Sequence, residues 1–215
     1  MQLKNLSPDQ KAGLKEGTLL PLMEEFYTLQ GEGRHTGQAA YFLRVGGCDV
    51  GCDFCDVKES WNAALHPLTK ADDIVARASQ QPAKAVVITG GEPLLYNMDY
   101  LCKQLHARNI TIYLETSGSS AFSGEWDWVC LSAKRRLVPV PTNYARADEL
   151  KMIIASENDF AFAEEQAAKV RKDCLLYLQP EWSVQEKLTP VIIDYILTHP
   201  QWRISLQSHK FMHIP

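Results

Sequence analysis

The sequence predicts an α/β protein built on a parallel sheet. After residue 38, short β-rich runs alternate with helical patterns, which is the order of successive βα units. Several of these runs are continuously apolar, as expected for parallel strands that are covered on both faces. With 215 residues, the chain is most simply one domain, 1–215, in which we expect residues 1–20 to be a peripheral N-terminal extension.

The elements follow one another in a regular order along the chain. Strands are predicted at 39–45, 85–89, 110–115, 128–132, 150–155, 174–179 and 202–207. Helices are predicted at 70–80, 97–108, 158–172 and roughly 188–198. This alternation is compatible with an open or a closed parallel sheet.

Polar residues follow most of the predicted strands. The strand-end sequences are GGEP after AVVIT, TSG after ITIYLE, AK after VCLS, QPEW after LLYL, and SHK after ISLQ. In parallel α/β barrels the chemistry collects at the carboxyl ends of the strands. Turn formation alone explains one or two such ends, whereas five in succession predict a ligand site lined by strand ends.

Composition excludes several classes of function. The net charge is -4, and the nearest approach to a basic run is Lys134-Arg135-Arg136, so we expect no nucleic-acid partner. No segment approaches the ~20 apolar residues of a membrane span, and residues 1–17 lack an apolar signal core. We therefore expect a cytoplasmic protein without a membrane partner, whose cysteines are reduced.

Three of the six cysteines lie within eight residues, in CDVGCDFC. A structural zinc site would need a fourth ligand, for which His66 or His35 are candidates. Alternatively, the thiolates of Cys48, Cys52 and Cys55 bind three irons of an iron–sulfur cluster and leave the fourth iron open to a ligand. The cluster is the favoured interpretation, because structural zinc usually draws cysteine pairs from two separate loops.

The spacing CxxxCxxC directly after a first strand is typical of the radical S-adenosylmethionine superfamily. A second motif agrees, since Gly90-Gly91-Glu92-Pro93 resembles the superfamily's GGE element, which binds the methionyl amino group. Backbone carbonyls and a carboxylate are suitable acceptors for that ammonium. Two motifs in the right order, each at a strand end, are far more specific than either alone.

The resemblance narrows to the 7-carboxy-7-deazaguanine synthase family. It rests on residues 21–61, which include YTLQGEGRHTG, on VVITGGEPL (86–94), YLETSG (113–118), LSAK (131–134), LYLQPEW (176–182) and SLQSHKFMHIP (205–215). These segments cover nearly the whole chain after the first twenty residues. The resemblance implies a homodimer with a modified, incomplete parallel (β/α) barrel of the triose-isomerase type, as in other radical enzymes of this superfamily.

The activity implied by the resemblance is that of a carbon–nitrogen lyase of queuosine and 7-deazapurine biosynthesis. A [4Fe-4S] cluster with S-adenosylmethionine generates a 5′-deoxyadenosyl radical, which takes a hydrogen atom from C6 of 6-carboxy-5,6,7,8-tetrahydropterin. The pterin ring contracts, ammonia leaves and 7-carboxy-7-deazaguanine forms. The implied partners are the small pterin substrate and an electron donor such as a flavodoxin, and the family uses magnesium.

Site residues carry over by position. Cys48, Cys52 and Cys55 would bind the cluster, and together with Arg44 they are the predicted catalytic residues. The predicted S-adenosylmethionine positions are Phe54, Cys55, Asp56, Gly91, Ser117, Ser132, Ala133, Lys134 and Gln179. The predicted substrate positions are Leu29, Gln30, Gly31, Arg44, Thr89, His209 and Pro215.

Two of these positions also have a physical argument. A guanidinium suits a substrate carboxylate, and the apolar setting of Arg44 in AAYFLRVGG weakens the alternative of a surface ion pair. Pro215 would act through its terminal carboxylate, which can accept two hydrogen bonds from the amino-pyrimidinone edge of a pterin.

One residue departs from the family pattern. The family commonly has Asp-Thr after the third cysteine, and the threonine hydroxyl is a magnesium ligand, whereas this chain has Asp56-Val57. Magnesium needs oxygen ligands, so we expect weak magnesium dependence or a differently built site, with water, substrate oxygens, Asp56 or Ser60 as substitutes.

The alternative functions are a glycyl-radical-activating or other small radical enzyme and, from a different class, a non-catalytic zinc-binding module.

Overall fold

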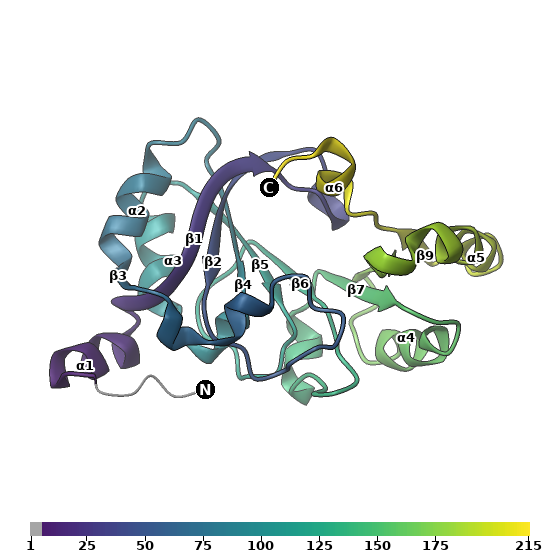
Figure 1. The fold of residues 1–215 in the computed structure, drawn as a ribbon, viewed down its shortest axis with the longest axis horizontal. Coiled ribbons are helices and arrows are strands. Elements are labelled where there is room, and N and C mark those ends of the chain that lie inside the picture. Colours follow the sequence, from purple (N-terminus) through teal and green to yellow (C-terminus); the bar gives the residue numbers. More distant parts are fainter. Residues whose placement is uncertain (1–5) are drawn as a thin grey trace.

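The computed structural model describes residues 6–215, and within them the chain forms one nine-stranded open sheet flanked by helices (Figure 1). The order of strands in the sheet is β3-β1-β2-β4-β5-β6-β7-β8-β9. The strands are β1 (Leu19–Leu29), β2 (Ala39–Val45), β3 (Leu68–Lys70), β4 (Ala85–Gly90), β5 (Thr111–Thr116), β6 (Trp128–Leu131), β7 (Glu149–Ile154), β8 (Leu175–Pro180) and β9 (Trp202–Ile204). All neighbouring pairs from β2 to β9 are parallel, while β1 is antiparallel to both β2 and β3.

Helices cover the outer face of the sheet in two groups. In Figure 1, α2 and α3 lie beside one half of the sheet and α4 and α5 beside the other. The helices are α1 (Pro8–Glu16), α2 (Ala71–Ser79), α3 (Asp99–His106), α4 (Asp159–Ala167), α5 (Gln185–Thr198) and α6 (Ser208–Met212). Each group packs on its own apolar cluster, with Ile88 and Ile112 in the first, and Leu150 and Leu178 in the second.

Within residues 6–215, no helix combines the length and the apolar character needed to cross a lipid bilayer.

The alternation of side chains along two strands explains how polar groups reach the inner face of the sheet. In β7, Leu150 and Met152 belong to the cluster under the helices, so the intervening Lys151 points to the opposite face. In β5, Ile112 packs under the helices and Leu114 is buried in a separate apolar cluster with Leu94 and Val129, so the intervening Tyr113 and the next residue, Glu115, alternate to the inner face. Apolar packing outside therefore fixes charged groups inside.

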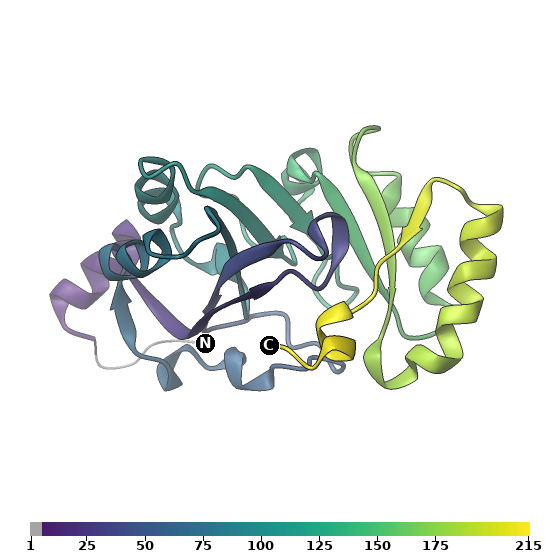
Figure 2. The ribbon, with the colours of Figure 1, turned by 90° about the horizontal axis from the view of Figure 1, so that it is seen from above.

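The open side of the sheet is partly filled by the loop between β1 and β2 and by the end of the chain. Ser208 N donates to Gly31 O at 2.9 Å, and Gly33 N donates to Ser205 Oγ at 3.0 Å. Gly33 has a φ of 63°, and a Cβ there would lie 2.2 Å from a Glu149 carboxylate oxygen, so this close approach requires glycine. Figure 2 shows the C-terminal residues returning toward this loop.

Most of the predicted elements are confirmed, with differences at their ends. The strands predicted at 39–45, 85–89, 110–115, 128–132, 150–155 and 174–179 are present within a residue or two. The strand predicted at 202–207 is wrong after Ile204, because the following residues form a loop and α6. The helix predicted at 158–172 ends at Ala167, and the one predicted at 188–198 begins at Gln185.

The N-terminal part of the chain holds structure that periodicity did not reveal. Ser7 and Gln10 form a capping box at the start of α1, and β1 begins at Leu19. The last two residues of the extension 1–20 thus belong to the sheet, while residues 1–5 lie outside the described part. The long strand β1 and the short β3 were not predicted.

Candidate active site

A cavity of about 590 Å³ opens at the carboxyl ends of the parallel strands. Its wall includes residues of the β1–β2 loop, the cysteine loop (residues 48–57), the ends of several strands and the C-terminal segment (residues 207–215). Polar strand ends converge here, as the sequence pattern predicts.

The structure brings nearly all of the predicted site residues to this one cavity. Those that line it are Leu29, Gln30, Gly31, Arg44, Cys48, Cys52, Phe54, Cys55, Asp56, Thr89, Gly91, Ser117, Ser132, Lys134, Gln179, His209 and Pro215. Ala133 does not, because it is 3% exposed and packs in the core under α4 and α5.

The three close cysteines are free thiols of intermediate exposure. Burial raises the pKa of Cys48 and of Cys52, as expected for thiols in a protein wall without a bound cation. Trp61 Nε1 lies 3.4 Å from Cys55 Sγ and can donate to that sulfur. Three free sulfur donors on one short loop, facing a cavity, fit an iron–sulfur cluster that keeps one iron open.

The histidines proposed as a fourth zinc ligand are engaged elsewhere. The imidazole Nε2 of His66 is 3.0 Å from Glu59 O, and His35 stacks on Tyr113 at 4.2 Å between ring centroids. Neither histidine lines the cavity. The structure therefore gives no support to a Cys₃His zinc centre built from these residues. The other three cysteines, Cys102, Cys130 and Cys174, are buried.

The glycines of GGEP let the end of β4 pack against the start of the cysteine loop. A Cβ at position 91 would lie 2.1 Å from Gly47 O and 2.9 Å from Cys48 Cβ. Gly91 N donates to Val45 O at 2.9 Å, and Glu92 N donates to Gly47 O at 2.8 Å. The motif thus positions the first cysteine, in addition to any contact with a ligand.

The carboxylate of the same motif does not face the cavity, which corrects the expectation that it is an acceptor for the methionyl ammonium. Glu92 is fully buried, and it accepts hydrogen bonds from the Thr116 hydroxyl at 2.5 Å and from Ser117 N at 2.8 Å. It also accepts from the Ser117 hydroxyl and from Leu94 N. Burial raises its pKa despite these four donors. Glu92 therefore joins the ends of β4 and β5, and within GGE the backbone is the part that reaches the cavity.

Arg44 has features of both alternatives considered from the sequence, an ion pair and a guanidinium that faces a ligand. Its Nε donates to Glu24 Oε1 at 2.6 Å, and its side chain is 20% exposed. The residue nevertheless lines the cavity, and among residues 6–215 the Nη groups have no hydrogen-bond partner. Glu24 thus orients a guanidinium whose Nη groups remain available.

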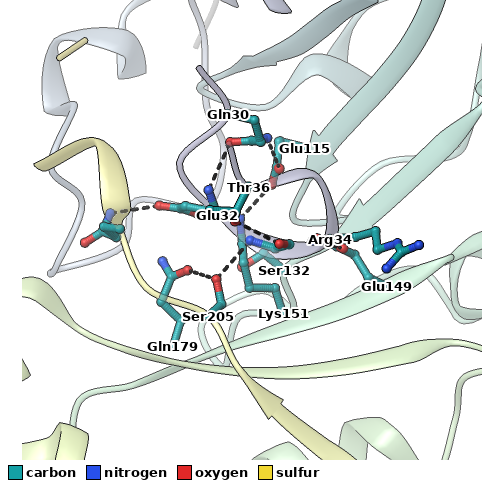
Figure 3. Close-up of polar contacts among 12 residues, drawn as sticks. Gln30, Glu32, Arg34, Thr36, Glu115, Ser132, Glu149, Lys151, Gln179 and Ser205 are labelled. Carbon is teal, nitrogen blue, oxygen red and sulfur yellow. Dashed lines mark hydrogen bonds and ion pairs between the residues drawn. The ribbon is translucent and has the colours of Figure 1, made fainter. Parts of the chain in front are cut away.

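A buried charged network forms the floor of the cavity (Figure 3). Lys151 Nζ lies 2.5 Å from Glu32 Oε2 and 2.8 Å from Glu115 Oε2, and the lysine side chain is 5% exposed. Burial alone would raise the pKa of Glu32, but the charge and hydrogen bond of Lys151, with a bond from Gln207, lower it to about 2. Glu32 and Glu115 are therefore two oriented carboxylates beside one ammonium.

Neighbouring polar residues extend this network to the predicted substrate positions. Gln30 Nε2 donates to Glu115 Oε1 at 3.3 Å, and Gln207 Nε2 donates to Glu32 Oε1 at 2.9 Å. Ser205 Oγ donates to Gln179 Oε1 at 2.7 Å. Hydrogen bonds thus connect the LQGEG loop (residues 29–33), the strand ends and the C-terminal segment in the floor of the cavity.

Comparisons with known proteins agree with this geometry. A curated 7-carboxy-7-deazaguanine synthase of Flavobacterium psychrophilum is 56% identical over 210 residues, covering 98% of this chain and 100% of the relative. The same enzyme of Synechocystis sp. is 45% identical, covering 89% of this chain and 92% of the relative. The chain belongs to the 7-carboxy-7-deazaguanine synthase family.

The fold and the superfamily are shown as well. The crystal structure of QueE from Escherichia coli matches with a TM-score of 0.81 at 28% identity, covering 95% of this chain and 100% of that one. The model of the radical SAM superfamily matches residues 43–140, which contain the three cysteines and GGEP. The sequence-based assignment to this family, and to an α/β fold with an incomplete parallel barrel, is confirmed. The sheet is open and mostly parallel, with β1 antiparallel to both of its neighbours.

Position 57 lacks the hydroxyl that the resemblance implies as a magnesium ligand, because Val57 lines the cavity but offers no side-chain oxygen. Of its predicted substitutes, Ser60 is 1% exposed and donates to Val57 O at 2.7 Å, while Asp56 Oδ2 lies 2.9 Å from Lys210 Nζ. The hydroxyl of Ser60 is therefore engaged within the protein, whereas the exposed carboxylate of Asp56 keeps a second oxygen that can bind a cation.

Several cavity residues were missed by the sequence-based reasoning. They are Glu32, Lys151, Trp182, Gln207 and Lys210. Glu32 lies in LQGEG, but the sequence assigns it no role, and Lys151 lies inside the apolar strand predicted at 150–155. The one sequence signal that could have revealed Lys151 is that it is a charged residue within an otherwise apolar run.

Proposed function

We propose that this chain is a radical S-adenosylmethionine lyase that converts 6-carboxy-5,6,7,8-tetrahydropterin to 7-carboxy-7-deazaguanine with loss of ammonia, in queuosine and 7-deazapurine biosynthesis. One observation carries the proposal. A single cavity contains the three free thiols at one part of its wall and the LQGEG loop, Arg44 and the chain end at another. The full-length relatives named for this activity support the same conclusion.

In this proposal Cys48, Cys52 and Cys55 would hold a [4Fe-4S] cluster, and S-adenosylmethionine would bind in the same cavity. When bound, the two cofactors would supply the 5′-deoxyadenosyl radical chemistry that removes a hydrogen atom from C6 of the pterin. The S-adenosylmethionine positions are Phe54, Cys55, Asp56, Gly91, Ser117, Ser132, Lys134 and Gln179, all of which line the cavity. Ala133 packs in the core and does not line this part of the cavity.

The protein's own residues bind and orient the pterin. The Nη groups of Arg44 suit its carboxylate, and the terminal carboxylate at Pro215 suits the two adjacent donors of its amino-pyrimidinone edge. Burial lowers the pKa of His209, which favours the neutral imidazole that can both donate and accept a hydrogen bond. Leu29, Gln30, Gly31 and Thr89 complete the proposed substrate wall.

The carboxylates of Glu32 and Glu115, in the floor of the cavity, add negative charge to the proposed substrate wall. Lys151 keeps Glu32 ionised, because its ammonium lowers the pKa of that carboxyl to about 2. An ionised carboxylate accepts hydrogen bonds from ring N–H and amino groups, which a tetrahydropterin has in abundance. The floor thus favours a nitrogen-rich ring over an apolar one.

Magnesium contributes weakly in this proposal, because the side chain at position 57 offers no oxygen ligand. The remaining assignments follow the family. The enzyme acts as a homodimer in the cytoplasm and receives electrons from a donor such as a flavodoxin.

The test is an anaerobic assay of the cluster-reconstituted protein with S-adenosylmethionine, a strong reductant and 6-carboxy-tetrahydropterin, read by mass spectrometry. We expect 7-carboxy-7-deazaguanine from the wild type and none from Cys52→Ala. Cys174→Ala is the matched control, because Cys174 is a buried thiol outside the cavity. If 5′-deoxyadenosine forms without the deazaguanine, the substrate assignment is wrong. If neither forms and the protein holds zinc, the non-catalytic alternative is correct.

A further inference from the structure

The C-terminal segment (residues 207–215) is placed by contacts with other elements. Its helix α6 contains five residues, which is too short to be stable on its own. Ser208 N donates to Gly31 O at 2.9 Å, and Gln207 Nε2 donates to Glu32 Oε1 at 2.9 Å. These bonds attach the beginning of the segment to the LQGEG loop. Residues 210–215 must be fixed by something else.

Lys210 supplies a second attachment, to other parts of the chain. Its Nζ lies 2.9 Å from Asp56 Oδ2, in the cysteine loop, and 4.9 Å from the centroid of the Trp182 ring. Phe211 packs edge-on against the same ring at 5.4 Å. The lysine side chain is only 20% exposed although it lies in a segment with several exposed neighbours. One ammonium therefore joins the cysteine loop, the loop after β8 and the chain end.

We propose that Lys210 is a positioning residue that holds the C-terminal segment against the cysteine loop. This inference rests on the proposed function, in which the chain end binds the pterin and the cysteine loop binds the cofactors. By pairing with Asp56, directly after the third cysteine, Lys210 makes the placement of the substrate wall depend on the placement of the cofactor loop. Trp182 adds a cation–π contact to the same ammonium.

The expected effect falls on binding rather than on the chemical step. The ion pair is half-exposed on the Asp56 side, where the side chain is 55% exposed, so each contact of the ammonium is individually weak. Together they bias the segment toward the position that it has in this structure, and their loss lowers the fraction of protein that can bind substrate. We expect Lys210→Met to raise KM for the pterin about tenfold with little change in kcat.

The experiment compares Lys210→Met with Lys210→Arg, Trp182→Leu and a control, Lys172→Met. Methionine keeps the aliphatic length without the charge, arginine keeps the charge, and Lys172 is an exposed lysine away from the cavity. Hydrogen exchange of residues 207–215 is followed by mass spectrometry in the cluster-loaded protein, together with KM and kcat. We expect faster exchange in this segment for Lys210→Met, a smaller increase for Trp182→Leu, and wild-type behaviour for Lys210→Arg and Lys172→Met.

The exchange measurement separates this inference from the proposed function, because it needs no turnover. Unchanged exchange in Lys210→Met overturns the positioning role, whether or not the wild type makes the deazaguanine. Faster exchange over the whole chain also overturns it, since that result shows general destabilisation. Faster exchange confined to residues 207–215 supports it even if the wild type proves to act on another substrate.

Discussion

Replacing Lys151 with methionine tests how strongly the buried network holds the floor of the cavity together. The variant leaves the carboxylates of Glu32 and Glu115 without their shared cation, and these side chains are 17% and 19% exposed. Lys151 acts with Gln207 to lower the pKa of Glu32 from 4.5 to about 2. At 1.36 kcal/mol for each pH unit, that lowering corresponds to about 3 kcal/mol of stability.

The pH dependence of this effect has a definite sign. A carboxyl group with a lowered pKa in the folded state stabilises the fold fully above its unfolded value of 4.5, and that stabilisation is lost as the pH falls through about 2. We therefore expect Lys151→Met to lower the free energy of unfolding by about 3 kcal/mol at pH 7. The difference from the wild type should shrink steadily as the pH falls from 4.5 toward 2.

The assay is equilibrium unfolding by urea of both proteins, kept in the same cluster state under anaerobic conditions at several pH values. Lys169→Met is the matched control, because it breaks an exposed ion pair with Glu165 and should change stability by less than about 0.5 kcal/mol. A loss no larger than that of the control, or a loss that does not vary with pH, would refute the reasoning. Adding Glu32→Gln to Lys151→Met should restore part of the loss, since it removes one unpaired charge.

Four further outcomes follow from the site. Gly91→Ala should lower the iron content after reconstitution, measured against protein concentration, because its Cβ would lie 2.1 Å from Gly47 O; full iron loading would contradict the packing argument. Glu92→Ala should lower the free energy of unfolding by about 2–4 kcal/mol, since buried donors from β5 lose their acceptor; a wild-type urea midpoint would contradict this. A tag after Pro215 should abolish most turnover while an N-terminal tag does not, and equal rates would exclude a role for the terminal carboxylate. Chelation of magnesium should lower the rate less than twofold because of Val57, and a collapse that only magnesium reverses would show a site built from other oxygens.

The sequence was sufficient for the family, for most parallel strands and for many, but not all, of the residues that line the cavity. Those inferences depend on local patterns, because apolar runs and fixed motif spacings are visible without knowing which segments meet. Strand β1 was not visible in this way, because its sequence LLPLMEEFYTL contains a proline and two adjacent glutamates. It forms because its first residues pack in the core, where Leu20 is fully buried, and because it pairs antiparallel with β2.

The role of Glu92 shows a second limit of prediction from sequence. A motif indicates where a ligand binds, but it does not tell which atoms of the motif face that ligand. The donors that turn this carboxylate inward, Thr116 and Ser117, lie 24 and 25 residues later in the chain. Only the parallel pairing of β4 with β5 brings them to the end of β4.

The antiparallel strand that sequence periodicity missed explains why the site is assembled inside an open sheet. A parallel strand would deliver only its end to the cavity, whereas β1 turns at its end and leads its loop back across the open side. That loop carries Glu32 to Lys151 and places Gly33 against Glu149 of β7, contacts that connect segments more than a hundred residues apart. The C-terminal segment then joins the same loop through Ser208. The open side of the sheet is therefore covered by the β1–β2 loop and the C-terminal segment, which carry most of the proposed substrate positions. The substrate wall and the covering of the open side thus depend on the same hydrogen bonds.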